Sequence, residues 1–159
     1  MTNSESPSMW KGILIGGTAA GILSIIPILN LLNLFFMTWM AVGGGLAVYL
    51  FMRENGGKRI KTGEALLTGA LSGVWGCAIF GVFVYTALSR ISPEKVAKAA
   101  SLLRTFFPDI EEEMSTLLYG DNLNALFMLV FALLMIISII AGALGGIMSK
   151  SFSLKEQDE

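Results

Sequence analysis

Few residues in this chain of 159 have side chains that could carry out chemistry. There is no histidine, and the one cysteine, Cys77, lies within an apolar stretch. A single thiol cannot form a disulfide within the chain, and without histidine it cannot complete a Cys/His zinc site. We therefore interpret Cys77 as a small packing residue and not as a reactive group.

Two patterns could bind a cation, and neither is specific. The consecutive acids Glu111, Glu112 and Glu113 would point in different directions on a helix, and their spacing is not that of an EF-hand. Met37 and Met40 have a spacing that suits Cu(I), but methionine is also a common packing residue in apolar regions. We expect a solvated helix start and apolar packing here, and hence no metal and no cofactor.

The rest of the sequence has the composition of a membrane protein. Apolar residues make up 54% of the chain, charged residues only 14%, and the mean hydropathy is positive. A soluble fold of this size would leave too much of that apolar surface exposed to water. The formal net charge of −1 and the lack of a basic stripe argue against nucleic acid as a partner.

No charged residue occurs between Lys11 and Arg53. As a helix rising about 1.5 Å per residue, this run would span about twice the ~30 Å hydrocarbon core of a bilayer, so we expect two antiparallel helices. Two further apolar stretches follow. The predicted fold class is therefore all-α: a polytopic membrane protein, with one membrane domain and four transmembrane helices in two hairpins, at 12–29, 34–52, 65–88 and 123–148.

Small residues recur every four positions in three of these predicted helices. Positions i and i+4 share a helix face, so the small residues form one stripe along each helix. In lipid, such a stripe lets two helix backbones approach closely. The stripes, which we predict to be helix-packing surfaces of the glycine-zipper type, consist of Gly12, Gly16, Ala20 and Ser24, of Gly69, Gly73, Cys77 and Gly81, and of Gly142 and Gly146.

The turn of the first hairpin contains two amides, those of Asn30 and Asn33. Asparagine is a favoured cap and turn residue, so we expect these amides to cap the second helix. The alternative is a polar pathway for small solutes through the bundle. The residues that would line that pathway are Asn30, Asn33, Thr38, Ser72 and Thr86.

The predicted loop 53–64 carries four bases, Arg53, Lys58, Arg59 and Lys61. The positive-inside rule places this loop in the cytoplasm, and four spans then place both termini there too. The expected location is the inner membrane of a bacterium. As an alternative role, the same four bases could bind lipid headgroups.

The segment 90–122, expected outside the cytoplasm, differs from the spans. Ser92 and Pro93 form a helix start, and Pro108 separates this helix from a second one that has acids in its first turn. We predict two short amphipathic helices at 92–118, which lie on the membrane surface or on the bundle. The polar tail 150–159 is expected to be disordered.

Three glycine-rich runs carry a resemblance to known proteins. The run 20–27 with Asn30 and Asn33, the run 43–50 and the run 63–70 resemble small four-span bacterial membrane proteins of unknown activity. The resemblance covers about the first half of the chain. It implies a membrane fold and transfers no activity and no catalytic residue.

The predicted spans contain no ionisable group of the kind that proton-coupled transport uses, and no nucleophile beside a base. We therefore expect a protein that is not an enzyme: a glycine-packed bundle acting as an interaction or assembly component. Its partners would be the lipid bilayer and either itself or another membrane protein. The alternatives are a small channel or facilitator near Asn30 and Asn33, and headgroup binding through the basic loop.

Overall fold

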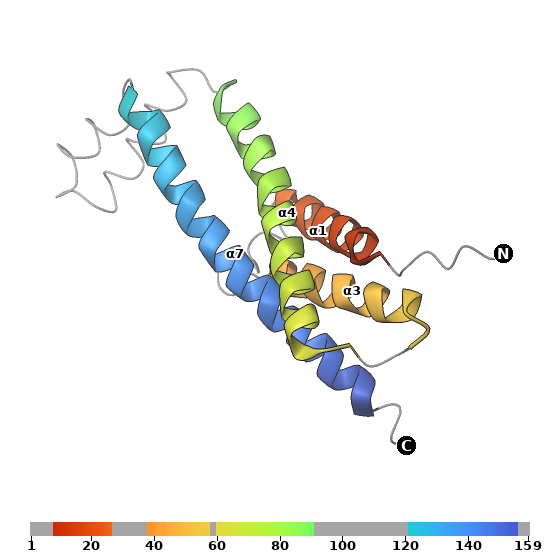
Figure 1. Cartoon of the computed structure of the whole chain (residues 1–159). Helices are drawn as coiled ribbons and strands as arrows, with labels where there is room; N and C mark the ends of the chain where they lie inside the picture. The colour runs from red at the N-terminus through yellow and green to blue at the C-terminus, as the bar shows by residue number, and fades with distance from the viewer. Residues whose placement is uncertain (1–7, 27–37, 58–59, 91–120, 156–159) are drawn as a thin grey trace. The chain divides into compact units, whose positions relative to one another are not determined.

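The computed structural model describes residues 8–26, 38–57, 60–90 and 121–155. In this part the chain forms four α-helices and no strand, which confirms the all-α class (Figure 1). The helices are α1 (Met9–Ile25), α3 (Thr38–Glu54), α4 (Thr62–Leu88) and α7 (Asp121–Lys155). The predicted amphipathic helices at 92–118 lie outside the described residues.

Two of the four helices are long and apolar enough to cross a membrane. They are α4, over Thr62–Ala87, and α7, over Phe127–Phe152. Helices α1 and α3 have 17 residues each. At about 1.5 Å per residue they extend about 25 Å, less than the ~30 Å hydrocarbon core. Two candidate spans are therefore present among the described residues, and the four-span topology stays a prediction.

Helix α1 begins and ends earlier than the predicted 12–29. Ser8 precedes its first residue in an extended conformation, and Ile26 is again extended, with φ −73° and ψ 117°. The residue before a proline is pushed away from the helical region by the proline ring, and Pro27 follows Ile26. The predicted continuation of the helix through Ile26 is therefore wrong.

The loop after α3 is shorter than the predicted 53–64. The N–H of Gly57 donates to the carbonyl of Met52 at 3.1 Å, and that of Gly56 donates to Arg53 at 3.2 Å. This pair of bonds is a Schellman cap, which needs a residue with positive φ, and Gly56 has a φ of 66°. The cap lets α3 continue past the predicted end at Met52 to Glu54.

Helix α4 begins at Thr62 and not at the predicted residue 65. The N–H of Lys61 donates to Oε2 of Glu64 at 2.7 Å. An acid at the third helical position that reaches back to the N-cap N–H is one half of a capping box. Glu64 therefore holds the first turn of the helix in place, a role that the sequence analysis did not assign to it.

Helix α7 continues to Lys155, past the predicted end at Met148. The hydroxyl of Ser151 donates to the carbonyl of Ile147 at 3.0 Å, and residues 149–155 contain neither proline nor glycine to stop the helix. The expectation of a disordered tail is therefore wrong for residues 150–155. Residues 156–159 lie outside the described part.

The chain divides into two compact units. Unit 1 comprises Met1–Val82 and Leu134–Glu159, and unit 2 comprises Phe83–Leu133, so α4 and α7 contribute to both. In unit 1, α1 and α3 run side by side (Figure 1). A cluster of buried apolar side chains marks the end of α3 and the start of α4: Val48, Phe51, Met52, Ile60 and Ala65.

Candidate functional site

The backbones of α1 and α3 touch each other where both helices carry small residues. A Cβ atom added at Gly16 would overlap the carbonyl oxygen of Gly43, and one added at Gly12 would overlap that of Ala47. A Cβ added at Gly43 would lie 2.6 Å from Cβ of Ala20, closer than real side chains come. The contact therefore exists because side-chain atoms are missing at these positions.

Helix α7 meets both α3 and α4 at Gly142. A Cβ added at Gly44 of α3 or at Gly69 of α4 would overlap the carbonyl oxygen of Gly142. One turn away, a Cβ added at Gly73 would overlap the carbonyl oxygen of Ser138. Two helices, α3 and α4, thus approach one short stretch of α7 to backbone contact. We call this place the glycine junction, defined by Gly44, Gly69 and Gly142.

Helices α1 and α4 are joined in a similar way, with one hydrogen bond added. A Cβ added at Gly17 would lie 2.6 Å from the carbonyl oxygen of Ser72, and one added at Gly21 would lie 2.9 Å from that of Gly76. Nε1 of Trp75 donates to Oγ1 of Thr18 at 3.1 Å. The bond pairs the indole N–H and the hydroxyl with each other on an exposed part of these helices.

All the residues predicted as helix-packing positions are buried. They are Gly12, Gly16, Ala20 and Ser24 of α1, Gly69, Gly73, Cys77 and Gly81 of α4, and Gly142 and Gly146 of α7. The four-residue stripes did not include Gly17, Gly43, Gly44 or Gly145, which also make backbone contacts. A helix that touches two neighbours needs small residues on two faces, and these glycines supply the second face.

Large apolar side chains lie on the outside of unit 1. Leu14, Ile15, Ile22, Val42, Leu66, Leu67, Ile136, Ile137, Ile140, Leu144 and Met148 are all exposed. The buried positions are mostly glycine, alanine, serine, threonine and cysteine. A water-soluble protein buries its large apolar residues, whereas helices packed in lipid bury small residues and expose large apolar ones.

Hydroxyl groups are also buried in unit 1. The hydroxyl of Ser24 donates to the carbonyl of Ala20, one turn earlier in the same helix, at 2.8 Å. The hydroxyl oxygens of Thr68, Ser72 and Ser138 are buried and have no hydrogen-bond partner among the described residues. Ser138 has the thiol of Cys77 as a neighbour, and a thiol is only a weak donor and acceptor.

Three of the five residues predicted to line a pathway are among the described residues. Ser72 is buried and Thr38 is half-buried, both in unit 1, and Thr86 is exposed in unit 2. Asn30 and Asn33 lie outside the described residues. The pathway therefore stays a prediction.

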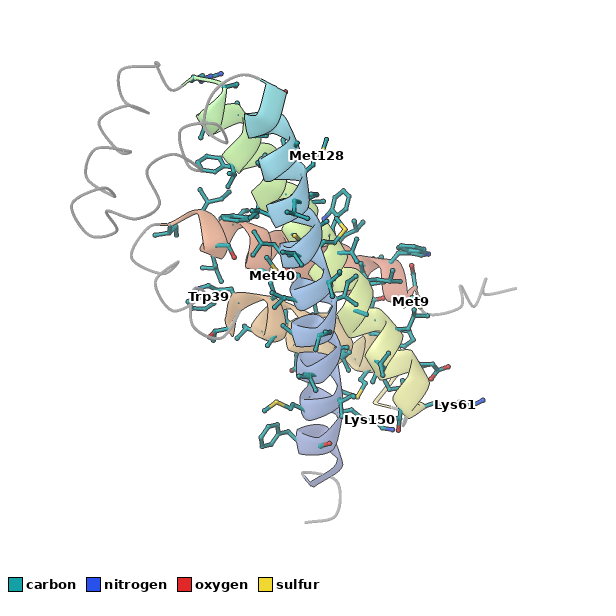
Figure 2. All side chains as sticks on the ribbon, turned by 90° about the vertical axis from the view of Figure 1, so that its left-hand side faces the viewer. Met9, Trp39, Met40, Lys61, Met128 and Lys150 are labelled. Carbon is teal, nitrogen blue, oxygen red and sulfur yellow. The ribbon has the colours of Figure 1, made fainter. Side chains whose placement is uncertain are left out.

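The described residues also bear on the possible metal sites. No three histidine, cysteine, aspartate or glutamate residues among them lie close enough together to hold a metal ion. Met40, labelled in Figure 2, is buried, and its sulfur lies 3.1 Å from where a Cβ of Gly76 would be. Met37 and the acids Glu111, Glu112 and Glu113 lie outside the described residues.

Charged side chains of unit 1 gather where α1 and α4 begin and α3 and α7 end. Nζ of Lys11 lies 3.5 Å from Oε1 of Glu54, and Nζ of Lys150 donates to Oγ1 of Thr62 at 2.7 Å. Figure 2 shows Lys61 and Lys150 at the same end of the helices. We call this place the charged end, defined by Lys11, Arg53, Glu54, Lys61, Glu64 and Lys150.

Two of the four bases predicted to contact headgroups belong to the charged end. Arg53 and Lys61 are exposed, and Lys58 and Arg59 lie outside the described residues. The geometry leaves Arg53 and Lys61 accessible to an anionic group. Headgroup binding by the four bases stays a prediction.

Comparisons with models of protein families, with curated proteins and with solved structures give no match to this chain. The resemblance to small four-span bacterial membrane proteins therefore stays a prediction that rests on the glycine-rich runs.

Proposed function

We propose that this chain is an integral membrane protein that is not an enzyme and acts as an interaction or assembly component. The observation that carries the proposal is the reversed distribution of side chains in unit 1. Glycine, alanine, serine and threonine line the contacts between helices, while leucine, isoleucine and valine face outward. Lipid stabilises this arrangement because it solvates the outer side chains and leaves the small residues to pack against each other.

In this proposal, α4 and α7 cross the bilayer, and α1 and α3 form the other hairpin of a four-span bundle in a bacterial inner membrane. The charged end supports a cytoplasmic position for that end of unit 1, because Lys11, Arg53, Lys61 and Lys150 outnumber the acids Glu54 and Glu64 there. We expect alkaline carbonate extraction to leave the protein in the membrane fraction. Release into the soluble fraction would contradict membrane integration.

Topology has its own test, in which the native thiol is first removed by Cys77→Ala. A membrane-impermeant maleimide added to intact cells should fail to label Lys11→Cys or Lys150→Cys, and should label both after the membrane is opened. Labelling of both variants in intact cells would place the charged end outside the cytoplasm. Labelling of only one would contradict the four-span topology.

In the assembly role, a second chain would contact part of the apolar face that α7 leaves exposed, which includes Ile136, Ile140 and Leu144. We expect native mass spectrometry of the protein, released from mild detergent at low concentration, to show a complex larger than one chain. A monomer in both native mass spectrometry and cross-linking of intact membranes would contradict the assembly role. Membrane integration would stand, because carbonate extraction tests it separately.

The packing that underlies this proposal is tested by Gly16→Leu and Gly73→Leu. Both substitutions place a side chain where a carbonyl oxygen of a neighbouring helix lies, so we expect a lower midpoint of thermal unfolding in detergent. Gly63→Leu is the matched control, because a Cβ at Gly63 meets nothing within 4 Å. Unchanged midpoints for Gly16→Leu and Gly73→Leu would contradict the packing proposal.

A second candidate is a channel or facilitator for small neutral solutes. The buried hydroxyl of Ser72, which has no hydrogen-bond partner, favours it because an interior polar group can contact a permeating solute. Flux of water and glycerol into liposomes containing the protein would test it, with Asn33→Leu as the variant expected to reduce the flux. Absence of flux for ions, water and glycerol would exclude this candidate.

A further inference from the structure

The hydroxyls of Thr68 and Ser72 are a pair. Both residues are fully buried in α4, and neither oxygen has a hydrogen-bond partner. Positions i and i+4 of a helix face the same way, with Cβ atoms about 5–6 Å apart. A single small molecule that both donates and accepts hydrogen bonds, placed between the two oxygens, can therefore bond to both of them.

The usual solution for a buried serine in a helix is to donate to the carbonyl one turn earlier. Ser24 does so in α1, at 2.8 Å from the carbonyl of Ala20, and Ser151 does so in α7. Thr68 and Ser72 do not form this bond. A buried hydroxyl without a partner is destabilising, so two of them in adjacent turns require an explanation.

Among the described residues, no neighbouring helix gives either hydroxyl a hydrogen-bond partner. Gly17 of α1 lies against the backbone of Ser72, and Gly21 lies against that of Gly76. Ile13, four residues before Gly17 in α1 as Thr68 is four residues before Ser72 in α4, is also buried. Isoleucine and glycine have no polar side-chain atom.

The third helix at this face is α3, which contributes the thioether of Met40 beside Gly76. A thioether is a weak acceptor. The one charged residue within a turn of either hydroxyl along α4 is Glu64, which is exposed and whose Oε2 accepts from the N–H of Lys61. The neighbours named above are uncharged. An occupant of this place must therefore be small, uncharged and able both to donate and to accept hydrogen bonds.

We propose that Thr68 and Ser72 bind one water molecule inside unit 1. The water bridges Oγ1 of Thr68 and Oγ of Ser72 and donates to a carbonyl oxygen of α4, which gives it the two to four partners that a buried water requires. Lipid cannot supply these hydrogen bonds, so the water belongs to the folded protein. This inference goes beyond the proposed assembly role and does not depend on it.

The test is the transfer of magnetisation from water to backbone amides of the full-length protein in perdeuterated detergent. We expect the amides of residues 68–73 in the wild type to show cross-peaks with a long-lived water. Thr68→Val and Ser72→Ala each remove one hydroxyl and should abolish these cross-peaks. Ser24→Ala removes a hydroxyl that is already satisfied within its helix and should leave them unchanged.

Thermal unfolding gives a second readout that does not need the spectra of the variants. If the water is bound, Thr68→Val lowers the unfolding midpoint by about 2–4 °C, and adding Ser72→Ala changes it little, because one water is lost in either case. If no water is bound to the hydroxyls, each substitution removes a polar group without a partner and raises the unfolding midpoint, and the two effects add. A raised midpoint for Thr68→Val, or a wild type without water cross-peaks, would overturn the proposal.

Discussion

Helices α4 and α7 pack through different chemistry in the two units. In unit 1, Gly69 and Gly73 of α4 lie so close to Gly142 and Ser138 of α7 that an added Cβ would overlap a carbonyl oxygen. In unit 2, the rings of Tyr85 and Phe127 lie 5.6 Å apart at 51°, and Phe127 stacks on Phe131 at 5.9 Å. The same two helices therefore pack backbone against backbone over glycine in unit 1, and through large aromatic side chains in unit 2.

The two kinds of contact respond to mutation in opposite ways. A backbone contact over glycine is lost when atoms are added, because the carbonyl oxygen opposite belongs to a rigid helix and cannot move aside. A ring contact is weakened when atoms are removed, and neighbouring side chains or lipid can fill part of the space. Unit 1 should thus be far more sensitive to a single added side chain than unit 2 is to a single deleted ring.

The largest effect is expected for Gly142→Leu, at the centre of the glycine junction. The new side chain would overlap the carbonyl oxygen of Gly69 and force α4 away from α7. We expect a loss of more than about 3 kcal/mol in the free energy of unfolding, or no folded protein at all. The measurement is thermal or chemical unfolding in detergent, followed by circular dichroism.

Gly63→Leu is the matched control for this substitution. Gly63 lies in the first turn of α4, where a Cβ meets nothing within 4 Å. Replacing a helical glycine in open space should stabilise the helix by up to about 1 kcal/mol. Equal losses for Gly142→Leu and Gly63→Leu would show that unit 1 responds to leucine in general and not to overlap at the junction.

For unit 2 the corresponding change is Phe127→Leu, which removes the ring that contacts both Tyr85 and Phe131. An aromatic pair contributes about 0.5–1.5 kcal/mol beyond the area that it buries, so we expect a loss of about 1 kcal/mol. Phe83→Leu, at an exposed position of α4, should have a smaller effect and serves as the control. A loss as large as that of Gly142→Leu would abolish the contrast between the two units.

Much of unit 1 could be predicted from the sequence, because glycine every fourth residue has few explanations in an apolar helix. The stripes containing Gly16, Gly73 and Gly142 all fall at buried positions. The partner of each stripe could not be predicted, since the same spacing fits any neighbouring backbone. The contact of Gly142 with both Gly44 and Gly69 depends on how three helices cross, which no single helix encodes.

Helix ends were predicted less well, and each error has a local cause. Pro27 ends α1 before the predicted residue because it makes Ile26 extended, and Glu64 starts α4 early by capping Lys61. Hydropathy is averaged over many residues, so it does not resolve the effect of one proline or of one hydrogen bond. The contact between the rings of Tyr85 and Phe127 was also missed, because these residues are far apart in the sequence and follow no period.

A smaller effect is expected where a hydrogen bond joins two helices of unit 1. Nε1 of Trp75 donates to Oγ1 of Thr18 at 3.1 Å, next to the contact between Gly17 and α4. A double-mutant cycle with Trp75→Phe and Thr18→Val isolates this bond, and we expect a coupling of about 0.6 kcal/mol, typical of such bonds in membranes. A coupling above about 2 kcal/mol would mean that polar bonds, and not backbone contacts, hold α1 on α4.

The smallest effect is expected at the charged end, for the ion pair between Lys11 and Glu54. Nζ and Oε1 lie 3.5 Å apart, and the Lys11 side chain is 69% exposed, so water and salt screen the attraction. Lys11→Met should change the unfolding midpoint little, and the same small difference should shrink further when the salt concentration is raised. Because the pair joins the first turn of α1 to the last turn of α3, it tests what holds these two helices together. A large loss that disappears at high salt would show that the charges hold α1 against α3, whereas an unchanged midpoint leaves Gly12, Gly16 and Gly43 as the contacts that do so.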